Sequence, residues 1–199
     1  MTNIKKIFID MDDTLFRFRD RMCEVTGTDK QKAMEYMKDT RLDPFDDFNR
    51  CLNINRQVFK NLMAMESFWE DMKVVPNSKD LMDLCTGVVG IDSISIATTP
   101  QYTPACFSGK LRLLQKRNLT IPTILIEDKS LLAQYDRVLI DDRPDVCNEF
   151  MLAGGFAINF QHDWSNPDIN YERQIQSIAE QLKAIDDAMS KIKNRNRRS

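Results

Sequence analysis

The stretch Ile4-Lys-Lys-Ile-Phe-Ile-Asp-Met-Asp-Asp-Thr-Leu15 decides how the rest of the chain is interpreted. It opens with a short apolar run, as expected for a strand that is buried on both faces of a parallel sheet. Three carboxylates, Asp10, Asp12 and Asp13, follow directly after this run. Because ligands of open α/β sheets bind at the carboxyl ends of the strands, this is where we expect chemistry.

Four further apolar runs resemble the first one, which spans 6–9, and they occupy residues 93–97, 122–126, 137–140 and 156–160. Helical patterns lie between the later runs, at 106–117 and 145–152, and Gly154 with Gly155 stops the second of them. This alternation predicts the α/β class, with a doubly wound, Rossmann-like parallel sheet.

Residues 16–75 interrupt the alternation, since they contain no convincing strand and carry helical patterns at 30–37, 46–52 and 56–65. About sixty residues between two strands is far more than a crossover needs. We therefore expect a helical cap inserted into an α/β core that comprises residues 1–15 and 76–199. A helix at 77–85 would lead into the second strand.

The C-terminal region carries one apolar stripe at helical spacing, made by Ile175, Ile178, Leu182, Ile185, Met189 and Ile192. The run is shorter than the three to four heptads of a credible coiled coil, so we expect the helix to pack on the chain's own sheet. Five basic residues fall in the last nine positions, and we interpret 190–199 as a basic, frayed tail.

Composition excludes several classes of protein. The chain has 199 residues, 42% hydrophobic and 29% charged, as in compact globular domains. Its 28 basic and 30 acidic residues give no general attraction to nucleic acid, so a nucleic-acid partner is not expected. It lacks an apolar run of the ~20 residues that a membrane helix needs and begins without a signal peptide, so we expect a cytoplasmic protein with no membrane partner.

Cysteine and histidine content narrows the chemistry further. The five cysteines are scattered without a Cys-x-x-Cys pair, and we interpret them as reduced packing residues. The single histidine, His162, makes a histidine-rich metal site or a Ser-His-Asp triad hard to build. Carboxylates must therefore carry most of any catalysis.

A second carboxylate pair, Asp141 and Asp142, follows the fourth apolar run. Two acidic pairs at neighbouring strand ends would repel each other, and a divalent cation would relieve that repulsion. Oxygen ligands without histidine or thiolate favour Mg²⁺, which also accepts substrate phosphate as a ligand. Candidate metal ligands thus lie among the acidic residues that follow the first and fourth runs.

Hydroxyl and ammonium groups follow the second and third runs. Thr98 and Thr99 end the second run, Lys129 lies just beyond the third, and Lys110 is placed at the beginning of the helix after the threonines. Singly, such residues are usually turns or surface groups. Together at successive strand ends, they suit the oxygens of a phosphate.

This order of motifs resembles the haloacid dehalogenase-like (HAD) phosphohydrolase superfamily and, within it, the 5′(3′)-deoxyribonucleotidase family. The resemblance spans roughly residues 4–160 and rests on Asp10-Met11-Asp12 with Phe18, Phe68-Trp69-Glu70, Ile96-Ala97-Thr98-Thr99-Pro100 and Leu139-Ile140-Asp141-Asp142-Arg143-Pro144. Three positions depart from the family pattern: Gly109-Lys110 is followed by Leu111 rather than an aromatic residue, Glu127 replaces a basic residue, and Asp13 replaces the glycine of some members.

The resemblance implies a Mg²⁺-dependent phosphomonoesterase acting on deoxynucleoside monophosphates, with Asp10 as the nucleophile that forms an aspartyl-phosphate. Asp12 would be the general acid and then the base. The metal would be held by Asp10, the Asp12 carbonyl and Asp141, with Asp142 in support. Thr98 and Lys129 would hold the phosphoryl oxygens, Lys110 being the second candidate lysine.

Substrate-pocket residues implied by the resemblance lie mainly in the cap. Phe18 and Trp69 are the expected walls for a flat nucleobase, with Arg143 beside them and Phe45, Phe48 and Phe68 as further candidates. The alternative is that these rings form the cap's own core. Two other functions stay open: a phosphatase for another small phosphorylated metabolite, and a phosphoreceiver-like signalling module. A homodimer is compatible with the sequence.

Overall fold

The computed structural model describes residues 2–39, 50–101 and 103–196. The chain divides into two compact units. One, which we call the sheet unit, is formed by Met1–Leu15, Val75–Thr99 and Ile121–Ser199. The other, the helical unit, is formed by Phe16–Val74 and Pro100–Thr120. Each is described by itself.

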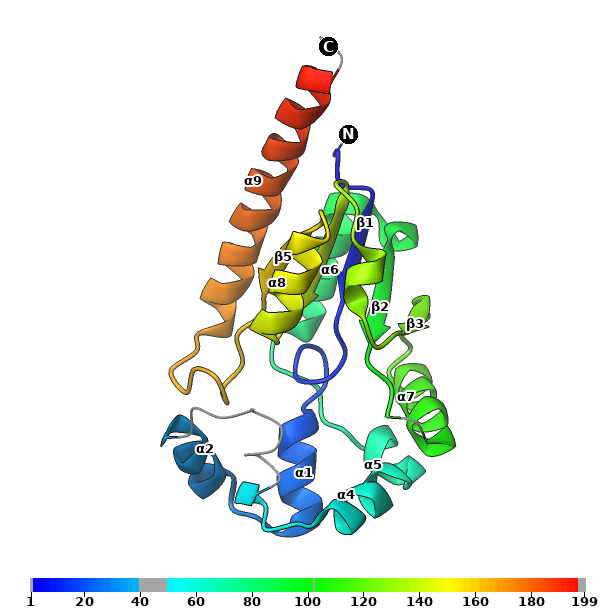
Figure 1. Cartoon of the computed structure of the whole chain (residues 1–199), viewed down its shortest axis with the longest axis vertical. Helices are drawn as coiled ribbons and strands as arrows, with labels where there is room; N and C mark the ends of the chain where they lie inside the picture. Colours follow the sequence, from blue (N-terminus) through cyan, green and yellow to red (C-terminus); the bar gives the residue numbers. More distant parts are fainter. Residues whose placement is uncertain (1, 40–49, 102, 197–199) are drawn as a thin grey trace. The chain divides into compact units, whose positions relative to one another are not determined.

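The sheet unit is built on a parallel sheet with the strand order β3-β2-β1-β4-β5 (Figure 1). Its described strands are β1 (Lys6–Ile9), β2 (Ile94–Thr98), β3 (Thr123–Leu125), β4 (Arg137–Asp141) and β5 (Phe156–Asn159). Each lies within a residue or two of the expected run. The chain adds β2 and β3 on one side of β1 and then β4 and β5 on the other, so β2 and β4 both pair with β1. The predicted fold class is confirmed.

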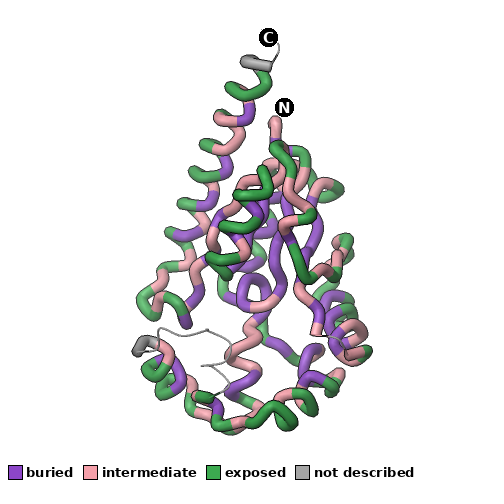
Figure 2. Tube along the Cα trace, in the orientation of Figure 1, coloured by how far each residue is buried: buried purple, intermediate pink, exposed green. Residues whose placement is uncertain are grey.

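Burial explains why the strand sequences are apolar without alternation. The inner strands are covered on both faces, as the continuous purple segments of Figure 2 show. On one face, Phe8, Ala97 and Leu139 pack with Phe150. Residues on either side of Phe8, Ile7 and Ile9, are fully buried as well. A strand with two buried faces has no position where a polar residue would be favoured.

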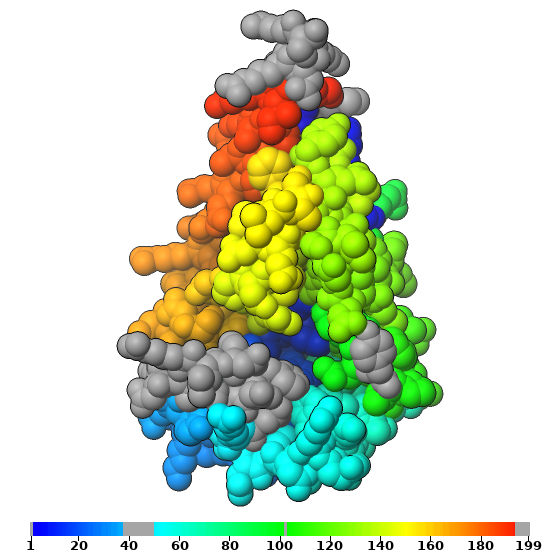
Figure 3. All heavy atoms as spheres, viewed as in Figure 1, coloured from blue at the N-terminus to red at the C-terminus, as the bar shows by residue number. Residues whose placement is uncertain are grey.

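The helices of the sheet unit are α6 (Ser78–Val89), α8 (Pro144–Leu152) and α9 (Tyr171–Asn196), with short 3₁₀ turns η1 (Ile91–Ser93) and η2 (Lys129–Leu132). Helix α8 packs on β4, β5 and η2, and it lies beside η2 at the surface shown in Figure 3. Helix α9 packs on α6 and β5, with Ile178, Leu182 and Met189 buried. The predicted packing of the apolar stripe on the chain's own fold is confirmed.

Helix α9 runs further than expected. It continues to Asn196, so residues 190–196 of the proposed frayed tail are helical, and 197–199 lie outside the described residues. The amide of Asn3 donates to Ser190 Oγ at 2.7 Å, which ties this turn to the N-terminal segment. The sequence has no glycine or proline here that would end the helix earlier.

The helical unit contains α1 (Phe18–Thr26), α2 (Lys30–Asp39), α4 (Arg56–Met63), α5 (Glu66–Glu70) and α7 (Pro104–Lys116). An antiparallel bridge between Phe16 and Val74 closes the base of the insert. Helix α1 was not predicted, and the helix expected at 46–52 lies largely outside the described residues. In the part of the chain that the structure describes, no helix is both long and apolar enough to cross a membrane.

Helix α7 belongs to the helical unit because it packs on α5, although the sequence assigned residues 76–199 to the core. It begins at Pro104, two residues earlier than expected, since Thr103 Oγ1 accepts a hydrogen bond from Cys106 N at 3.2 Å. Lys110 therefore lies in the middle of α7, and the prediction that it begins this helix is wrong.

Candidate active site

The central pair of the site, Asp10 and Asp141, comes from adjacent parallel strands. Ile9 of β1 is paired with Ile140 of β4, so the next residue of each strand reaches the same edge. Asp10 N also donates to Ile140 O at 2.9 Å, which extends the pairing to the start of the loop. Strand register alone thus brings together two carboxylates that are 131 residues apart in sequence.

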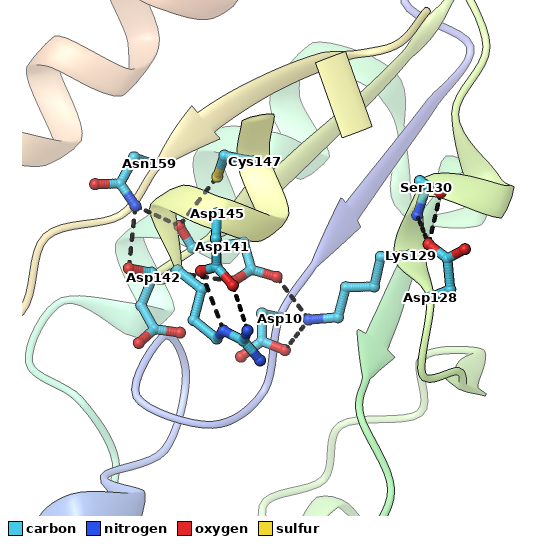
Figure 4. A network of polar contacts seen from close by, with 10 residues as sticks. Asp10, Asp128, Lys129, Ser130, Asp141, Asp142, Asp145, Cys147 and Asn159 are labelled. Carbon is cyan, nitrogen blue, oxygen red and sulfur yellow. Dashed lines mark hydrogen bonds and ion pairs between the residues drawn. The ribbon is translucent and has the colours of Figure 1, made fainter. Parts of the chain in front are cut away.

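Lys129, at the start of η2, connects the two carboxylates (Figure 4). Its ammonium forms a very short contact with Asp10 Oδ1 and lies 2.6 Å from Asp141 Oδ2. The side chains of all three residues are nearly inaccessible to solvent. Asp128, one residue earlier, caps η2 by accepting a hydrogen bond from Ser130 N at 2.9 Å. This cap places Lys129 at the first position of the turn.

Burial dominates the electrostatics of this group. It raises the pKa of Asp10 well above its ordinary value, and Lys129 opposes that rise while Asp141 adds to it. The pKa of Asp141 is raised for the same first reason, burial. Burial by itself would lower the pKa of Lys129, but the charges of Asp10 and Asp141 outweigh it and raise that pKa. The ammonium of Lys129 is therefore charged. Its one positive charge does not cancel the effect of burial on the carboxylates, because the pKa of Asp10 and that of Asp141 stay raised.

Asp10, Asp141 and Asp142, which we call the carboxylate cluster, fit a divalent cation. One oxygen from each lies within 4.8 Å of the others, and all three residues are buried. If all are ionised, the cluster carries three negative charges against the one positive charge of Lys129. An excess of two negative charges on hard oxygen donors is what Mg²⁺ would balance. The donor set thus fits the predicted metal.

The backbone of the loop after β4 is held by its neighbours. Asn159, the last residue of β5, donates its side-chain amide to the carbonyls of Asp141 at 3.2 Å and Asp142 at 3.0 Å. The backbone N–H of Arg143 donates to Asp141 Oδ1 at 3.0 Å. The main chain and one carboxylate of this loop are therefore positioned from outside the cluster.

Asp142 is contacted by the one histidine of the chain. Nε2 of His162 lies 3.3 Å from Asp142 Oδ2, and both side chains are buried. The other ring nitrogen, Nδ1, accepts from Trp164 N at 3.1 Å and Ser165 N at 3.2 Å. Sequence reasoning used His162 only to exclude classes of site, and it did not single out Asn159. The position of Asn159 at a strand end could have indicated it.

Other predicted residues of the sheet unit lie at the same edge. Thr98 ends β2 and is fully buried, and Thr99 follows it. Asp12 lies two residues beyond Asp10. Asp13 is buried with a φ of 57°, a left-handed conformation that glycine adopts most easily and that Asp tolerates better than most residues. The proposed catalytic and phosphate-binding roles stay predictions.

Predicted pocket residues of the helical unit form a packed group, the aromatic cluster of Phe18, Phe68 and Trp69. Phe18 stacks on Trp69 with ring centroids 5.8 Å apart, and Phe68 meets Trp69 edge-on at 5.0 Å. Trp69 is 1% exposed and donates its indole N–H to Met63 O at 3.1 Å. Trp69 and Phe68 are therefore core residues of this unit. Phe45 and Phe48 lie outside the described residues.

The two remaining candidates, Lys110 and Arg143, are placed differently from Lys129. Lys110 lies in the helical unit with its ammonium 4.9 Å from the Trp69 ring centroid. The Arg143 guanidinium forms an ion pair with Asp145, and its side chain is 54% exposed. Of the two candidate lysines, the structure brings only Lys129 against Asp10 among the contacts described above.

Comparison with solved structures shows which known fold this chain shares. Neither a family model nor a curated protein matches this sequence. A haloacid dehalogenase-like hydrolase from Xanthomonas campestris has a similar structure, with a TM-score of 0.58 and 11% identity over 96% of this chain and 95% of that one. An L-2-haloacid dehalogenase gives a TM-score of 0.51 and 10% identity over 84% of this chain and 89% of its own. At such low identity, the likeness concerns architecture, and the nucleotidase family stays a prediction. Strand order, carboxyl-edge cluster and structural neighbours agree: the chain has the α/β fold of the haloacid dehalogenase-like hydrolases.

Proposed function

We propose that the protein is a Mg²⁺-dependent phosphomonoesterase that hydrolyses deoxynucleoside monophosphates through an aspartyl-phosphate on Asp10. The observation that carries this proposal is the carboxylate cluster with Lys129 bridging Asp10 and Asp141. A phosphate monoester is a dianion, so it needs positive charge beside any carboxylate that attacks it. Lys129 and a divalent cation held by Asp10, Asp141 and Asp142 would supply that charge.

The residues suggest a two-step reaction. A carboxylate oxygen of Asp10 forms a bond to phosphorus while the bond from phosphorus to the ester oxygen breaks, and Asp12 gives its proton to that oxygen. Water then attacks the phosphorus of the aspartyl-phosphate and gives a proton to Asp12. The bond between Asp10 and phosphorus breaks, so inorganic phosphate is released and Asp10 is regenerated. Bound Mg²⁺ supplies electrostatic stabilisation of phosphoryl oxygens.

Lys129 has two tasks in this reaction. Its charge favours the ionised form of Asp10, whose pKa is otherwise raised by burial, and only the ionised form can attack. Contact with two carboxylates also fixes the ammonium at the edge of the sheet, ready to stabilise charge on a phosphoryl oxygen. Thr98, at the end of the neighbouring strand, is the proposed hydroxyl donor.

The nucleotide part of the proposal rests on the sequence motifs and on Phe18. Its ring is partly exposed, unlike Phe68 and Trp69, so it is the member of the aromatic cluster best suited to stack on a base. A phosphorylated metabolite without a base would gain nothing from this ring. Substrate choice therefore separates the main proposal from its nearest alternative.

The test is phosphate release from a panel of ribo- and deoxyribonucleoside monophosphates, sugar phosphates and a 2-haloacid, each with Mg²⁺ and with EDTA. We expect Mg²⁺-dependent release of phosphate, fastest from deoxynucleotides. Asp10→Asn should abolish it, because an amide cannot replace the carboxylate as nucleophile. Asp83→Asn, on the exposed face of α6, is the matched control and should retain full activity.

Three results would contradict the proposal. Unchanged turnover by Asp10→Asn would remove the nucleophile. Halide release from the 2-haloacid without phosphate release would indicate a dehalogenase. Stoichiometric phosphorylation of Asp10 without turnover would favour the phosphoreceiver alternative.

A further inference from the structure

We propose that His162 is a positioning residue: it holds the carboxylate of Asp142 in place for the divalent cation. This inference rests on the proposed function, because it concerns the same metal site. Its basis is the contact between His162 Nε2 and Asp142 Oδ2 at 3.3 Å, between side chains that are 7% and 6% exposed.

Hydrogen bonds determine which ring nitrogen carries the proton. Nδ1 accepts from two backbone N–H groups, those of Trp164 and Ser165, so Nδ1 has no proton of its own. In the neutral ring the proton is then on Nε2, which faces Asp142. The protonated Nε2 would then face Asp142 Oδ2 across the 3.3 Å contact.

The same loop fixes the ring itself. Ser165 Oγ accepts from His162 N at 3.2 Å and donates to His162 O at 3.0 Å, so the backbone of His162 is held as well as its Nδ1. The ring therefore cannot turn away from Asp142 without breaking the hydrogen bonds of its own loop. A rigid donor is what orients a carboxylate.

Main-chain position and side-chain direction are controlled separately at this site. Asn159 holds the carbonyls of Asp141 and Asp142, and Phe160 N donates to Asp141 O at 2.8 Å. These bonds place the loop but do not determine where the Asp142 carboxylate points. Asp10 and Asp141 would repel that carboxylate in the absence of a metal. The buried contact with His162 Nε2 opposes rotation of the carboxylate away from the cluster.

Two substitutions separate this role from a purely structural one. In His162→Asn, the side-chain oxygen occupies the place of Nδ1 and can still accept from Trp164 and Ser165, but the side chain is too short to reach Asp142. In His162→Gln, the side-chain amide reaches about as far as Nε2 and can still donate to Asp142, but the acceptor at Nδ1 is lost. One variant keeps the loop, and the other keeps the contact.

The experiment is calorimetric titration of Mg²⁺ into the metal-free full chain, together with thermal unfolding of the same samples. We expect His162→Asn to bind Mg²⁺ about 10- to 100-fold more weakly than the wild type, the usual effect of losing a group that orients a metal ligand, with a melting temperature close to that of the wild type. His162→Gln should keep most of the affinity and melt at a lower temperature.

Opposite results would overturn the inference. If His162→Asn binds Mg²⁺ as tightly as the wild type, or if His162→Gln loses as much affinity as His162→Asn, then His162 only shapes its loop. If the wild type itself binds no Mg²⁺, the proposed function fails together with the inference. If the wild type binds Mg²⁺, Asp141→Asn does not, and His162→Asn still does, then the inference fails while the proposed function stands.

Discussion

Among the residues whose burial the structure describes, each of the two units buries one lysine, and the contacts of the two lysines described above differ. Lys129 in the sheet unit is 4% exposed and contacts the carboxylates of Asp10 and Asp141. Lys110 in the helical unit is fully buried with its ammonium over the Trp69 ring. From the sequence, both lysines are candidates for binding the phosphate.

The difference shows how the surroundings of a buried cation limit its use. Lys129 forms ion pairs with two carboxylates, and these ion pairs hold it at the edge of the sheet where phosphate would bind. An aromatic face attracts Lys110 more weakly, by about 2 kcal/mol when water is excluded. Removing each lysine should therefore have unequal consequences for both stability and catalysis.

Lys129→Met is the substitution with the largest expected effect. Loss of one partner from a buried ion pair costs about 3–5 kcal/mol, because the carboxylates stay buried without compensation. Turnover should fall about 10²- to 10³-fold, the usual loss for a preorganised charge donor. Urea unfolding and steady-state phosphate release measure the two effects.

Lys110→Met is the matched control for that experiment. Its side chain can pack on Trp69 as a thioether, so we expect a smaller loss of stability, about 2 kcal/mol or less. Equal losses from the two substitutions would contradict the expected difference between the two lysines.

The second prediction concerns the charge of the cluster itself. The pKa of Asp10 is raised above its ordinary value of 3.8 in the folded protein, mainly by burial. Stability from such a group is fully present below the unfolded pKa and is lost as pH rises through the folded pKa. Without metal, the free energy of unfolding of Asp10→Asn should therefore be higher than that of the wild type at neutral pH.

Unfolding in urea at a series of pH values in EDTA tests this prediction. The difference between Asp10→Asn and the wild type should be small near pH 4, a value close to the ordinary pKa of 3.8, and should widen as the pH rises. A variant that is less stable than the wild type at neutral pH would mean that the ion pair with Lys129 outweighs burial.

Much of this cluster could be predicted because it depends on strand ends. In a parallel sheet, adjacent carboxyl ends meet at one edge, so apolar runs followed by Asp10 and Asp141 were enough to bring them together. Lys129 followed from the same rule, since it lies just beyond β3. The burial of these groups reinforces the rule, because buried charges need partners.

The rest depends on geometry that leaves little trace in sequence. His162 reaches Asp142 through a loop whose shape is set by hydrogen bonds to Trp164 and Ser165, and no residue pattern specifies that reach. Helix α1 begins after Arg17 with no side-chain cap, so it lacked the usual start signal. For α7, by contrast, Thr103-Pro104 is a start signal in the sequence, and it places Lys110 in the middle of that helix.

Metal removal tests the sheet unit alone. A ligand that binds only the folded state at 100 times its dissociation constant stabilises it by about 2.7 kcal/mol. Wild-type protein should gain this much with Mg²⁺ over EDTA, as measured by urea unfolding, whereas Asp141→Asn should gain much less. Lys110→Met should respond like the wild type, because its lysine lies outside the carboxylate cluster. A reduced response in Lys110→Met would mean that the two lysines are not independent.

The last prediction crowds the aromatic cluster without changing a charge. A Cβ on Gly109 would lie 2.7 Å from Glu66 O and 2.7 Å from Trp69 Cβ, so backbone or ring must move. Gly109→Ala should cost about 1–3 kcal/mol, as overpacking does. Gly87→Ala in α6 is the control: a Cβ there meets nothing within 4 Å, and the helix should gain about 0.5–1 kcal/mol. If Gly109→Ala is as stable as Gly87→Ala, then Trp69 is not held tightly, and the ring beneath Lys110 is free to serve as a pocket wall rather than as core.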